Sequence, residues 1–376
     1  MKNLRVGLFT YGMSNHLTGI GNYAMETAYA LKRLALPLDL ILLNPYPESP
    51  LSWYQDFECF SVPNLKRLPD VLVKGPKVLH EAAIKLNLDI LHDPCGIAPF
   101  NLRREHYGRI VTIYDAIPVV HPNLQPFLTR LVFHTFVPAA KRSADAVITV
   151  SEHAKGDISK NIGIPKSLLH VIPPGTYFPP LSKLQEWYSE LPEILQTHNV
   201  TPPYFLFVGS SSPRKNLPII IRAFQQLRSR RPDVSFVMVG PQSPHVPTSA
   251  DGLRHLGYAS ETLLDTLYVG ASALVFPSLY EGFGMPILEA MARGTPVITS
   301  NTSSMPEAAG NAGILVDPND TSAITEAMHR CLDRPTAMKH SLRGRLWARR
   351  FDWETAAWST WRVYVKVAYP QEGLVV

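Results

Sequence analysis

The chain has 376 residues, 45% of them hydrophobic and 18% charged, which excludes an intrinsically disordered protein and favours two domains. The net charge of +5 permits anionic ligands or an anionic membrane surface, but it does not require nucleic acid as a partner. The three cysteines, Cys59, Cys95 and Cys331, have no CxxC spacing, so they predict neither a disulfide framework nor a zinc site.

The sequence contains no pattern typical of membrane insertion. No apolar run approaches the ~20 residues of a spanning helix. Residues 1–9 are typical of a strand rather than of a signal peptide. With the cysteine pattern, these features predict a cytoplasmic protein whose only membrane contact is peripheral, at the inner face.

Short apolar runs alternate with helical patterns along most of the chain. The first half predicts a helix at residues 22–34 and strands at 4–9, 38–43, 90–92, 110–113 and 146–150. A proline-rich segment, residues 173–203 around a predicted helix at 184–195, interrupts this pattern. The second half predicts strands at 204–208, 235–239, 273–276 and 296–299, and helices at 217–230, 263–269, 287–293, 323–332 and 353–368.

The alternation predicts an α/β protein with two Rossmann-like, doubly wound domains. We expect an N-terminal domain at residues 1–180 and a C-terminal domain at 200–352, with the aromatic-rich helical tail at 353–376 joining the first. Ligands of such sheets bind outside the carboxyl ends of the strands, so two such halves would face each other across a binding cleft.

The strongest motif begins at Glu281, after the predicted strand at 273–276. Gly282 and Gly284 allow close approach of a ligand to the backbone, and Pro286 is typical of a first helical turn. The loop would therefore present a helix N-terminus to a phosphate, with Glu281 and Glu289 available to sugar hydroxyls. The alternative is an exposed loop followed by a solvated helix face.

A second loop follows the predicted strand at 204–208. Gly209 and Ser210 precede two adjacent cations, Arg214 and Lys215, which could bind a diphosphate and stabilise it as a leaving group. The alternative is a solvated basic pair at a loop tip.

A third loop, at residues 18–24, matches GxGxxA through Gly19 and Gly21. The second strand ends at Leu43-Asn44 without the acid that would bind a ribose in an NAD site. We favour a glycine loop that approaches phosphate or acceptor; the alternative is a helix start with small residues for packing.

These segments resemble the retaining glycosyltransferases of family 4, which have the GT-B fold. The resemblance covers most of the chain and is densest over residues 204–318. The Pro-Arg-Lys-Asn segment at residues 213–216 is similar to that of bacterial mannosyl- and glucosyltransferases that build polysaccharides. The motifs that carry it are Glu281-x7-Glu289, Gly209 with Arg214-Lys215-Asn216, Gly19-Ile20-Gly21-Asn22-Tyr23, residues 147–152 and residues 305–310.

The resemblance implies a role for each matching residue. Lys215 and Arg214 would neutralise the donor diphosphate, Glu281 would bind the donor hexose, and Glu289 would bind the ribose. Asp115 would lie near the sugar and the acceptor. The remaining donor-binding residues would be Gly19, Gly21, Gly209, Ser210, Tyr258, Gly282, Phe283, Gly284, Met285, Ile287 and Leu288.

The chain departs from the family pattern beside Asp115. Relatives commonly carry histidine at the position that Tyr114 occupies here. His92, at the end of the preceding predicted strand, is a candidate substitute, and the alternative is a structural histidine.

The resemblance implies transfer of a hexose from UDP-glucose or GDP-mannose, with retention, to a growing polysaccharide or glycolipid. No DxD-type cluster follows a strand, so we expect no metal and no cofactor. An NAD-dependent oxidoreductase and a nucleotide-sugar epimerase are the alternatives. A further alternative is a binding module that uses Arg343, Arg345, Arg349 and Arg350, a run that is more often a solvated helix face. Ser304 and Glu307 match a capping box, so Glu307 receives no catalytic role.

Overall fold

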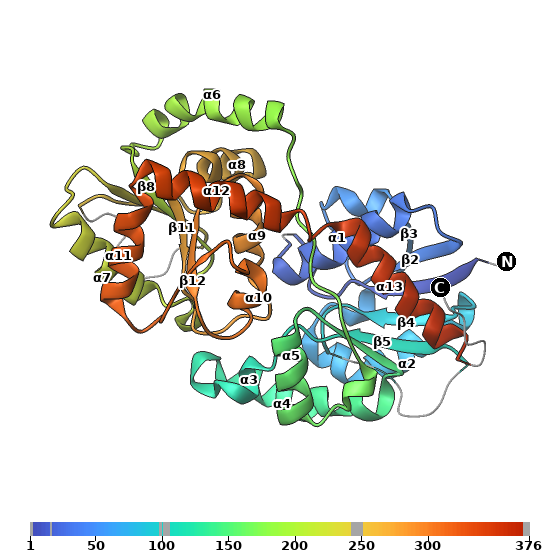
Figure 1. Ribbon diagram of the computed structural model, residues 1–376. Helices are drawn as coiled ribbons and strands as arrows, with labels where there is room; N and C mark the ends of the chain where they lie inside the picture. The colour runs from blue at the N-terminus through green and yellow to red at the C-terminus, as the bar shows by residue number, and fades with distance from the viewer. Residues whose placement is uncertain (1–2, 16, 98–99, 101–105, 242–250, 371–376) are drawn as a thin grey trace. The chain divides into compact units, whose positions relative to one another are not determined.

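The computed structural model describes residues 3–15, 17–97, 100, 106–241 and 251–370. The chain divides into two compact units (Figure 1), one made of Met1–Gly175 with Trp353–Val376 and the other of Thr176–Asp352. Thr176 N donates to Phe351 O at 2.9 Å, so the two ends of the second unit are joined by a backbone hydrogen bond.

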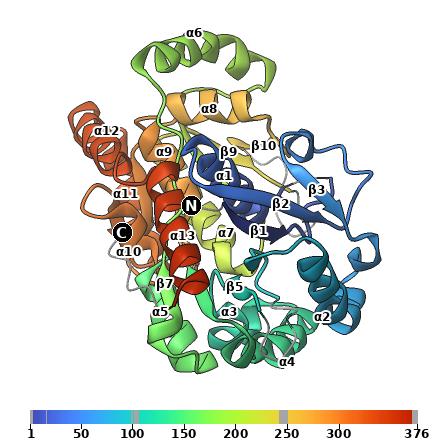
Figure 2. The ribbon, with the colours of Figure 1, turned by 90° about the vertical axis from the view of Figure 1, so that its right-hand side faces the viewer.

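The first unit contains a seven-stranded parallel sheet in the order β3-β2-β1-β4-β5-β6-β7, and Figure 2 shows β1 and β2 side by side. Its strands are β1 (Leu4–Phe9), β2 (Leu38–Asn44), β3 (Glu58–Ser61), β4 (Ile90–Asp93), β5 (Gly108–Thr112), β6 (Ala146–Thr149) and β7 (Leu169–Val171). Its helices are α1 (Gly19–Arg33), α2 (Leu68–Lys85), α3 (Ile117–Val120), α4 (Phe127–Ser143), α5 (Glu152–Asp157) and α13 (Trp353–Ala368).

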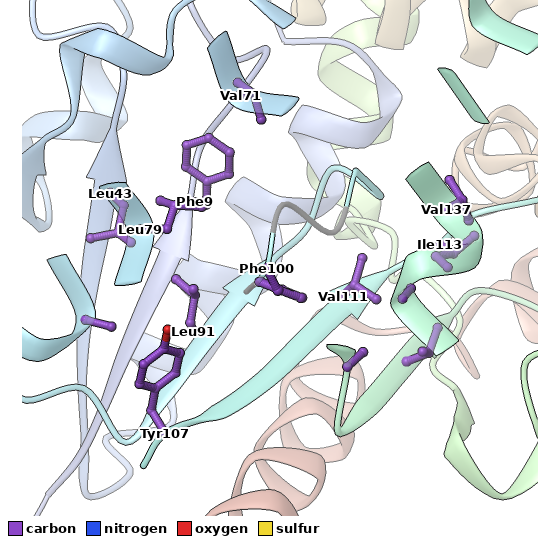
Figure 3. Close-up of a cluster of buried hydrophobic side chains, with 14 of the residues drawn as sticks. Phe9, Leu43, Val71, Leu79, Leu91, Phe100, Tyr107, Val111, Ile113 and Val137 are labelled. Atoms are coloured by element: carbon purple, nitrogen blue, oxygen red, sulfur yellow. The ribbon is translucent and has the colours of Figure 1, made fainter. Parts of the chain in front are cut away.

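Apolar side chains fill both faces of this sheet. One cluster, shown in Figure 3, packs Phe9, Leu43 and Leu91 from the strands against Val71 and Leu79 of α2. On the other face, α13 lies alongside α1 and buries aromatic and small side chains against the strands. Burial on both faces explains why the strands are continuous apolar runs.

The second unit contains a six-stranded parallel sheet in the order β10-β9-β8-β11-β12-β13. Its strands are β8 (Tyr204–Val208), β9 (Ser235–Val239), β10 (Leu253–His255), β11 (Ala273–Phe276), β12 (Val297–Ser300) and β13 (Ile314–Val316). Its helices are α6 (Leu181–Thr197), α7 (Leu217–Arg228), α8 (Glu261–Gly270), α9 (Met285–Ala292), α10 (Met305–Ala309), α11 (Thr321–Cys331) and α12 (Arg334–Ala348).

Helical periodicity accounts for the packing of the second unit. In α7, Leu217, Ile220, Phe224 and Leu227 recur every three or four residues and are buried against the strands and α11. Short 3-10 turns span Ser52–Gln55, Pro63–Leu65, Pro122–Leu124, Lys166–Leu168 and Pro213–Lys215, and a π-helical turn spans Ile158–Ile162.

The predicted strands are all present, with ends shifted by no more than two residues. The sequence patterns missed the outer strands β3, β7, β10 and β13, and they missed α2, α4 and α12. Outer strands are short and pair on one side only, so their apolar pattern is weak. The first helix begins at Gly19 rather than at Asn22.

Candidate active site

Strand order in the second unit brings two predicted loops together. The order changes direction between β8 and β11, the place where open α/β sheets bind ligands. The loop after β8 contacts the loop after β11, because Leu279 N donates to Arg214 O at 2.7 Å. Asn216 Nδ2 also donates to Pro277 O, at 3.3 Å. Asn216 was missed as a positioning residue although it directly follows the predicted cations.

The two predicted cations meet the first predicted carboxylate in this loop pair. Lys215 Nζ lies 2.7 Å from Glu281 Oε1, and Arg214 pairs with Glu281 Oε2. The Lys215 and Glu281 side chains are 9% and 8% exposed, so this ion pair is shielded from water, whereas the Arg214 side chain is 27% exposed. Lys215 Nζ also lies 4.2 Å from the centre of the Phe276 ring. Two cations and one carboxylate leave one net positive charge for an anionic ligand.

Burial and neighbouring charges shift the pKa values of Glu281 and Lys215 in opposite directions. Burial alone raises the pKa of Glu281, but Lys215 and Arg214 together hold that pKa below its ordinary value. Burial lowers the pKa of the Lys215 ammonium, and the Glu281 carboxylate opposes that shift. Glu281 is therefore ionised at neutral pH and positions both cations.

Glycine is required where the backbone approaches these cations. Gly209 has a φ of +145°, and a Cβ there would lie 3.3 Å from Lys215 Cε. Gly240, which follows β9, has a φ of +137°, and a Cβ there would lie 2.1 Å from Gly209 O. The sequence analysis missed Gly240, although a glycine directly after a predicted strand was a usable indication.

Helix α9 begins at the end of the second loop. Gly284 precedes it with a φ of +104°, and Pro286 lies in its first turn, as predicted. Ile287 N donates to Gly284 O at 3.0 Å. Ile287 and Leu288 are buried in the core. Phe283 is also buried, and its ring packs against Phe351.

Two serines after β12 hold the Glu281 loop. Ser303 Oγ accepts from Glu281 N at 3.2 Å and donates to Glu281 O at 2.9 Å. Ser304 Oγ contacts the carbonyl oxygens of Glu281 and Phe283 at 2.8 and 3.1 Å. The predicted capping box at Ser304 is therefore wrong, because the Ser304 hydroxyl turns to this loop and makes no cap bond to α10.

Glu289, the second predicted carboxylate, is positioned by a tyrosine. Tyr268 donates to Glu289 Oε2 at 2.9 Å, and burial raises the pKa of Glu289. Arg293 forms an ion pair with Asp265 at 2.7 Å and donates to Glu289 O at 3.4 Å. The sequence patterns did not identify Tyr268, because nothing in a helical pattern shows which tyrosine faces a neighbouring helix.

The other residues predicted in this unit lie around the same strand ends. Ser210 Oγ donates to Ser212 Oγ at 3.3 Å within the loop after β8. Tyr258 follows β10 and is 82% exposed. Gly282 lies in the segment that joins Glu281 to α9, and Met285 is the first residue of α9. The predicted donor residues of the second unit thus lie in the loops that follow β8, β10 and β11 and in helix α9.

The predicted glycines of the first unit lie in a helix rather than in a loop. Gly19 and Gly21 are in the first turn of α1, and a Cβ on Gly21 would lie 2.9 Å from Leu17 Cδ2. Gly21 therefore packs closely against Leu17, and its predicted contact with phosphate or acceptor stays a prediction. Asp115 lies in the loop before α3, where its Oδ1 accepts from Ile117 N at 3.0 Å.

Tyr114 and His92 both have structural partners. The Tyr114 hydroxyl donates to Pro94 O at 2.9 Å, and burial raises its pKa. The two ring nitrogens of His92 contact the Tyr364 hydroxyl at 2.8 Å and Thr112 Oγ1 at 2.9 Å. Burial lowers the pKa of His92 to about 3, so this histidine is neutral. His92 is thus a structural histidine, and the suggestion that it substitutes for the family histidine is wrong.

The described residues were compared with the requirements of a metal site and of a membrane-spanning helix. Among these residues, no group of three or more His, Cys, Asp or Glu residues is placed to hold a metal ion. Likewise, none of the helices at residues 3–97 and 106–370 whose placement is described has the length and hydropathy to cross a membrane.

Comparisons with known proteins agree with this architecture. Residues 17–177 match Glycosyltransferase Family 4, and residues 202–334 match Glycosyl transferases group 1. The two matches identify the chain as a glycosyltransferase that contains one domain of each kind. This assignment gives no support to an oxidoreductase or an epimerase.

Relatives of this glycosyltransferase match along nearly the whole chain. O-antigen chain mannosyltransferase B of Escherichia coli is 28% identical, over 93% of this chain and 96% of that protein. The MMP alpha-(1->4)-mannosyltransferase of Mycolicibacterium hassiacum is 25% identical, over 96% of this chain and 98% of that protein. The crystal structure of Anabaena HepE in complex with UDP and glucose has a TM-score of 0.71 at 18% identity, covering 96% of this chain and 99% of HepE. The glycosyltransferase therefore has the GT-B fold.

Proposed function

We propose that this glycosyltransferase moves a hexosyl group from a nucleoside diphosphate sugar, UDP-glucose or GDP-mannose, to a growing polysaccharide or glycolipid, with retention of configuration. The observation that carries the proposal is the buried cluster of Lys215, Arg214 and Glu281 beside the start of α9. Two relatives are named mannosyltransferases, which supports a mannosyl donor, and HepE was solved with UDP and glucose.

The cluster suits a diphosphate leaving group. As the bond from the anomeric carbon to the phosphate oxygen breaks, negative charge accumulates on the diphosphate. Lys215 and Arg214 would stabilise that charge in a site where little water screens it, because Lys215 is 7% exposed. The N-terminus of α9 would add the positive end of its helix dipole.

When the donor binds, its diphosphate would replace Glu281 as an ion-pair partner of Lys215 and Arg214. Before the donor binds, the two carboxylate oxygens of Glu281 neutralise Lys215 and Arg214. Diphosphate oxygens would take over part of these ion pairs and leave a Glu281 oxygen to accept a hydrogen bond from a hexose hydroxyl. Glu289, oriented by Tyr268, would accept from the ribose hydroxyls.

Retention would follow from attack on the face that the diphosphate leaves. The acceptor hydroxyl oxygen forms the new bond to the anomeric carbon, and its proton passes to the departing phosphate oxygen. The first unit would serve the acceptor, with Asp115 near the reacting hydroxyl; Oδ1 of Asp115 is held by Ile117 N. Because two side-chain cations already neutralise the diphosphate, we propose that the reaction needs no metal ion.

A thermal-shift screen tests the proposal. UDP-glucose and GDP-mannose are compared with UDP, GDP and NAD⁺, and a nucleotide sugar that binds the folded enzyme raises its Tm. We expect one nucleotide sugar to stabilise the wild type and to stabilise Lys215→Ala much less. NMR of the first product anomer then tests retention. Stabilisation by NAD⁺ alone, or an inverted product, would refute the proposal.

A further inference from the structure

Helix α12 carries an apolar stripe that no described part of the chain covers. Met338, Leu342 and Leu346 are 58%, 61% and 67% exposed. Their spacing of four residues places them on one side of the helix. Single exposed apolar residues are ordinary, but three in line on one helix mark a contact surface.

Cations flank this stripe. Lys339 and Arg343 are exposed, and each directly follows an apolar stripe residue, which places both along the same edge of the stripe. The sequence from residue 334 to residue 350 contains no aspartate and no glutamate. The outer face of α12, meaning Met338, Leu342 and Leu346 with Lys339 and Arg343, is therefore apolar along its middle and positive along one edge.

The inner face of α12 is firmly packed against its unit, and these contacts fix which side of the helix is exposed. Trp347 Nε1 donates to Ala308 O at 2.8 Å, and Arg345 donates to Ala292 O at 2.9 Å. Gly344 packs against Met291 of α9. Arg345 was predicted to be one of four arginines on a solvated helix face. It instead anchors the helix, so the prediction is wrong for Arg345.

Phe178 packs against one edge of the helix. The ring of Phe178 lies 4.4 Å from the Arg345 guanidinium and 4.8 Å from that of Arg349. Leu181, three residues after Phe178 at the start of α6, is 69% exposed. Figures 1 and 2 show α12 on the outside of its unit, with α9 on its inner side. A flat partner could therefore contact α12 along its length.

We propose that the outer face of α12 docks on the surface of an anionic phospholipid bilayer. An amphipathic helix lying in the membrane interface combines an apolar stripe with flanking lysine and arginine, the arrangement seen here. Anionic headgroups complement the cations, while the stripe enters the boundary between headgroups and acyl chains. The proposal does not depend on which donor or acceptor the enzyme uses.

The positive charge on the outer face of α12 argues against a second copy of the chain as its binding partner. In a two-fold symmetric dimer, the same face meets itself. The outer face of α12 would then bring Lys339 and Arg343 against the same cations of the other copy, with no acidic residue between positions 334 and 350 to separate them. Like charges across an interface repel, whereas a bilayer of anionic lipid attracts all of them.

Vesicle co-sedimentation of the full chain tests the proposal. Vesicles of phosphatidylglycerol with phosphatidylcholine are compared with vesicles of phosphatidylcholine alone. We expect the wild type to pellet with the anionic vesicles, to bind neutral vesicles about tenfold more weakly, and to lose binding in high salt. Binding that is equal for both vesicle types, or absent from both, overturns the proposal.

Matched variants assign the binding to α12. We expect the double variant Leu342→Glu/Leu346→Glu to bind anionic vesicles at least about tenfold more weakly, with an unchanged Tm because both side chains are exposed. Phe127→Glu, at a site 74% exposed in α4, should bind as the wild type does. If the double variant melts early, Lys339→Ser/Arg343→Ser repeats the test through charge. The proposal is refuted if the α12 variants still bind anionic vesicles, or if Phe127→Glu abolishes binding. It is also refuted if ultracentrifugation shows dimers that depend on α12 in place of vesicle binding.

Discussion

Replacing Lys215 by alanine tests the electrostatic core of the proposed mechanism. Lys215 is buried, lies 2.7 Å from Glu281, and is the nearer of the two cations to the Phe276 ring at the end of β11. In Lys215→Ala, the Glu281 carboxylate would be balanced by Arg214 alone. The net positive charge of the cluster would fall from one to zero, and the leaving diphosphate would meet a neutral site.

The expected size of the effect follows from Coulomb's law. A cation about 4 Å from the diphosphate charge, at an effective dielectric constant of about 20, is worth about 4 kcal/mol. Each ~1.4 kcal/mol changes a rate tenfold, so kcat should fall between about 10²-fold and 10³-fold once Arg214 compensates in part. Donor KM should change less, because the charge on the diphosphate grows as the bond breaks.

The assay measures release of the nucleoside diphosphate from the donor identified by thermal shift, with Tm as the check on folding. Lys183→Ala is the matched control, since Lys183 also pairs with a glutamate in the second unit but on its surface. It should leave kcat unchanged. Near-normal turnover of folded Lys215→Ala would refute the leaving-group argument.

Three further predictions follow from the same structure. The pKa of His92 is about 3 in the folded chain and near its ordinary 6.5 in the unfolded chain. The unfolded chain therefore takes up the proton first, and stability should fall by about 2 kcal/mol between pH 7.5 and pH 5 in urea unfolding, a loss that His92→Gln should reduce. Turnover should persist in EDTA, measured by the same diphosphate-release assay. Ser304→Ala should raise donor KM several-fold and cost about 1–2 kcal/mol of stability, because Glu281 O and Phe283 O lose a buried hydrogen-bond partner.

Each of these predictions has a result that contradicts it. Equal acid sensitivity of the wild type and His92→Gln would show that another group controls the pH dependence. Loss of turnover in EDTA that Mg²⁺ restores would show that the two cations do not suffice. Unchanged donor KM in Ser304→Ala would show that Ser304 does not position the Glu281 loop.

Local sequence determined the strands, the loop starts and the identity of the charged residues. Continuous apolar runs predicted the inner strands because those strands are buried on both faces. Gly284 and Pro286 predicted the start of α9 because each has a backbone preference that acts within one turn. Arg214, Lys215, Glu281 and Glu289 stood out because they lie in or just after two loops that contain glycine and follow predicted strands.

Tertiary structure decided which of these residues meet. Glu281 pairs with Lys215, 66 positions away, because β8 and β11 are neighbours in the sheet, and strand order is not encoded in any local pattern. The same reason explains the errors: Ser304 turned from its own helix to the Glu281 loop, and His92 found Tyr364 of α13 as a partner. Hydrogen bonds within a few residues can be predicted from spacing, whereas those between distant segments depend on packing that brings the segments together.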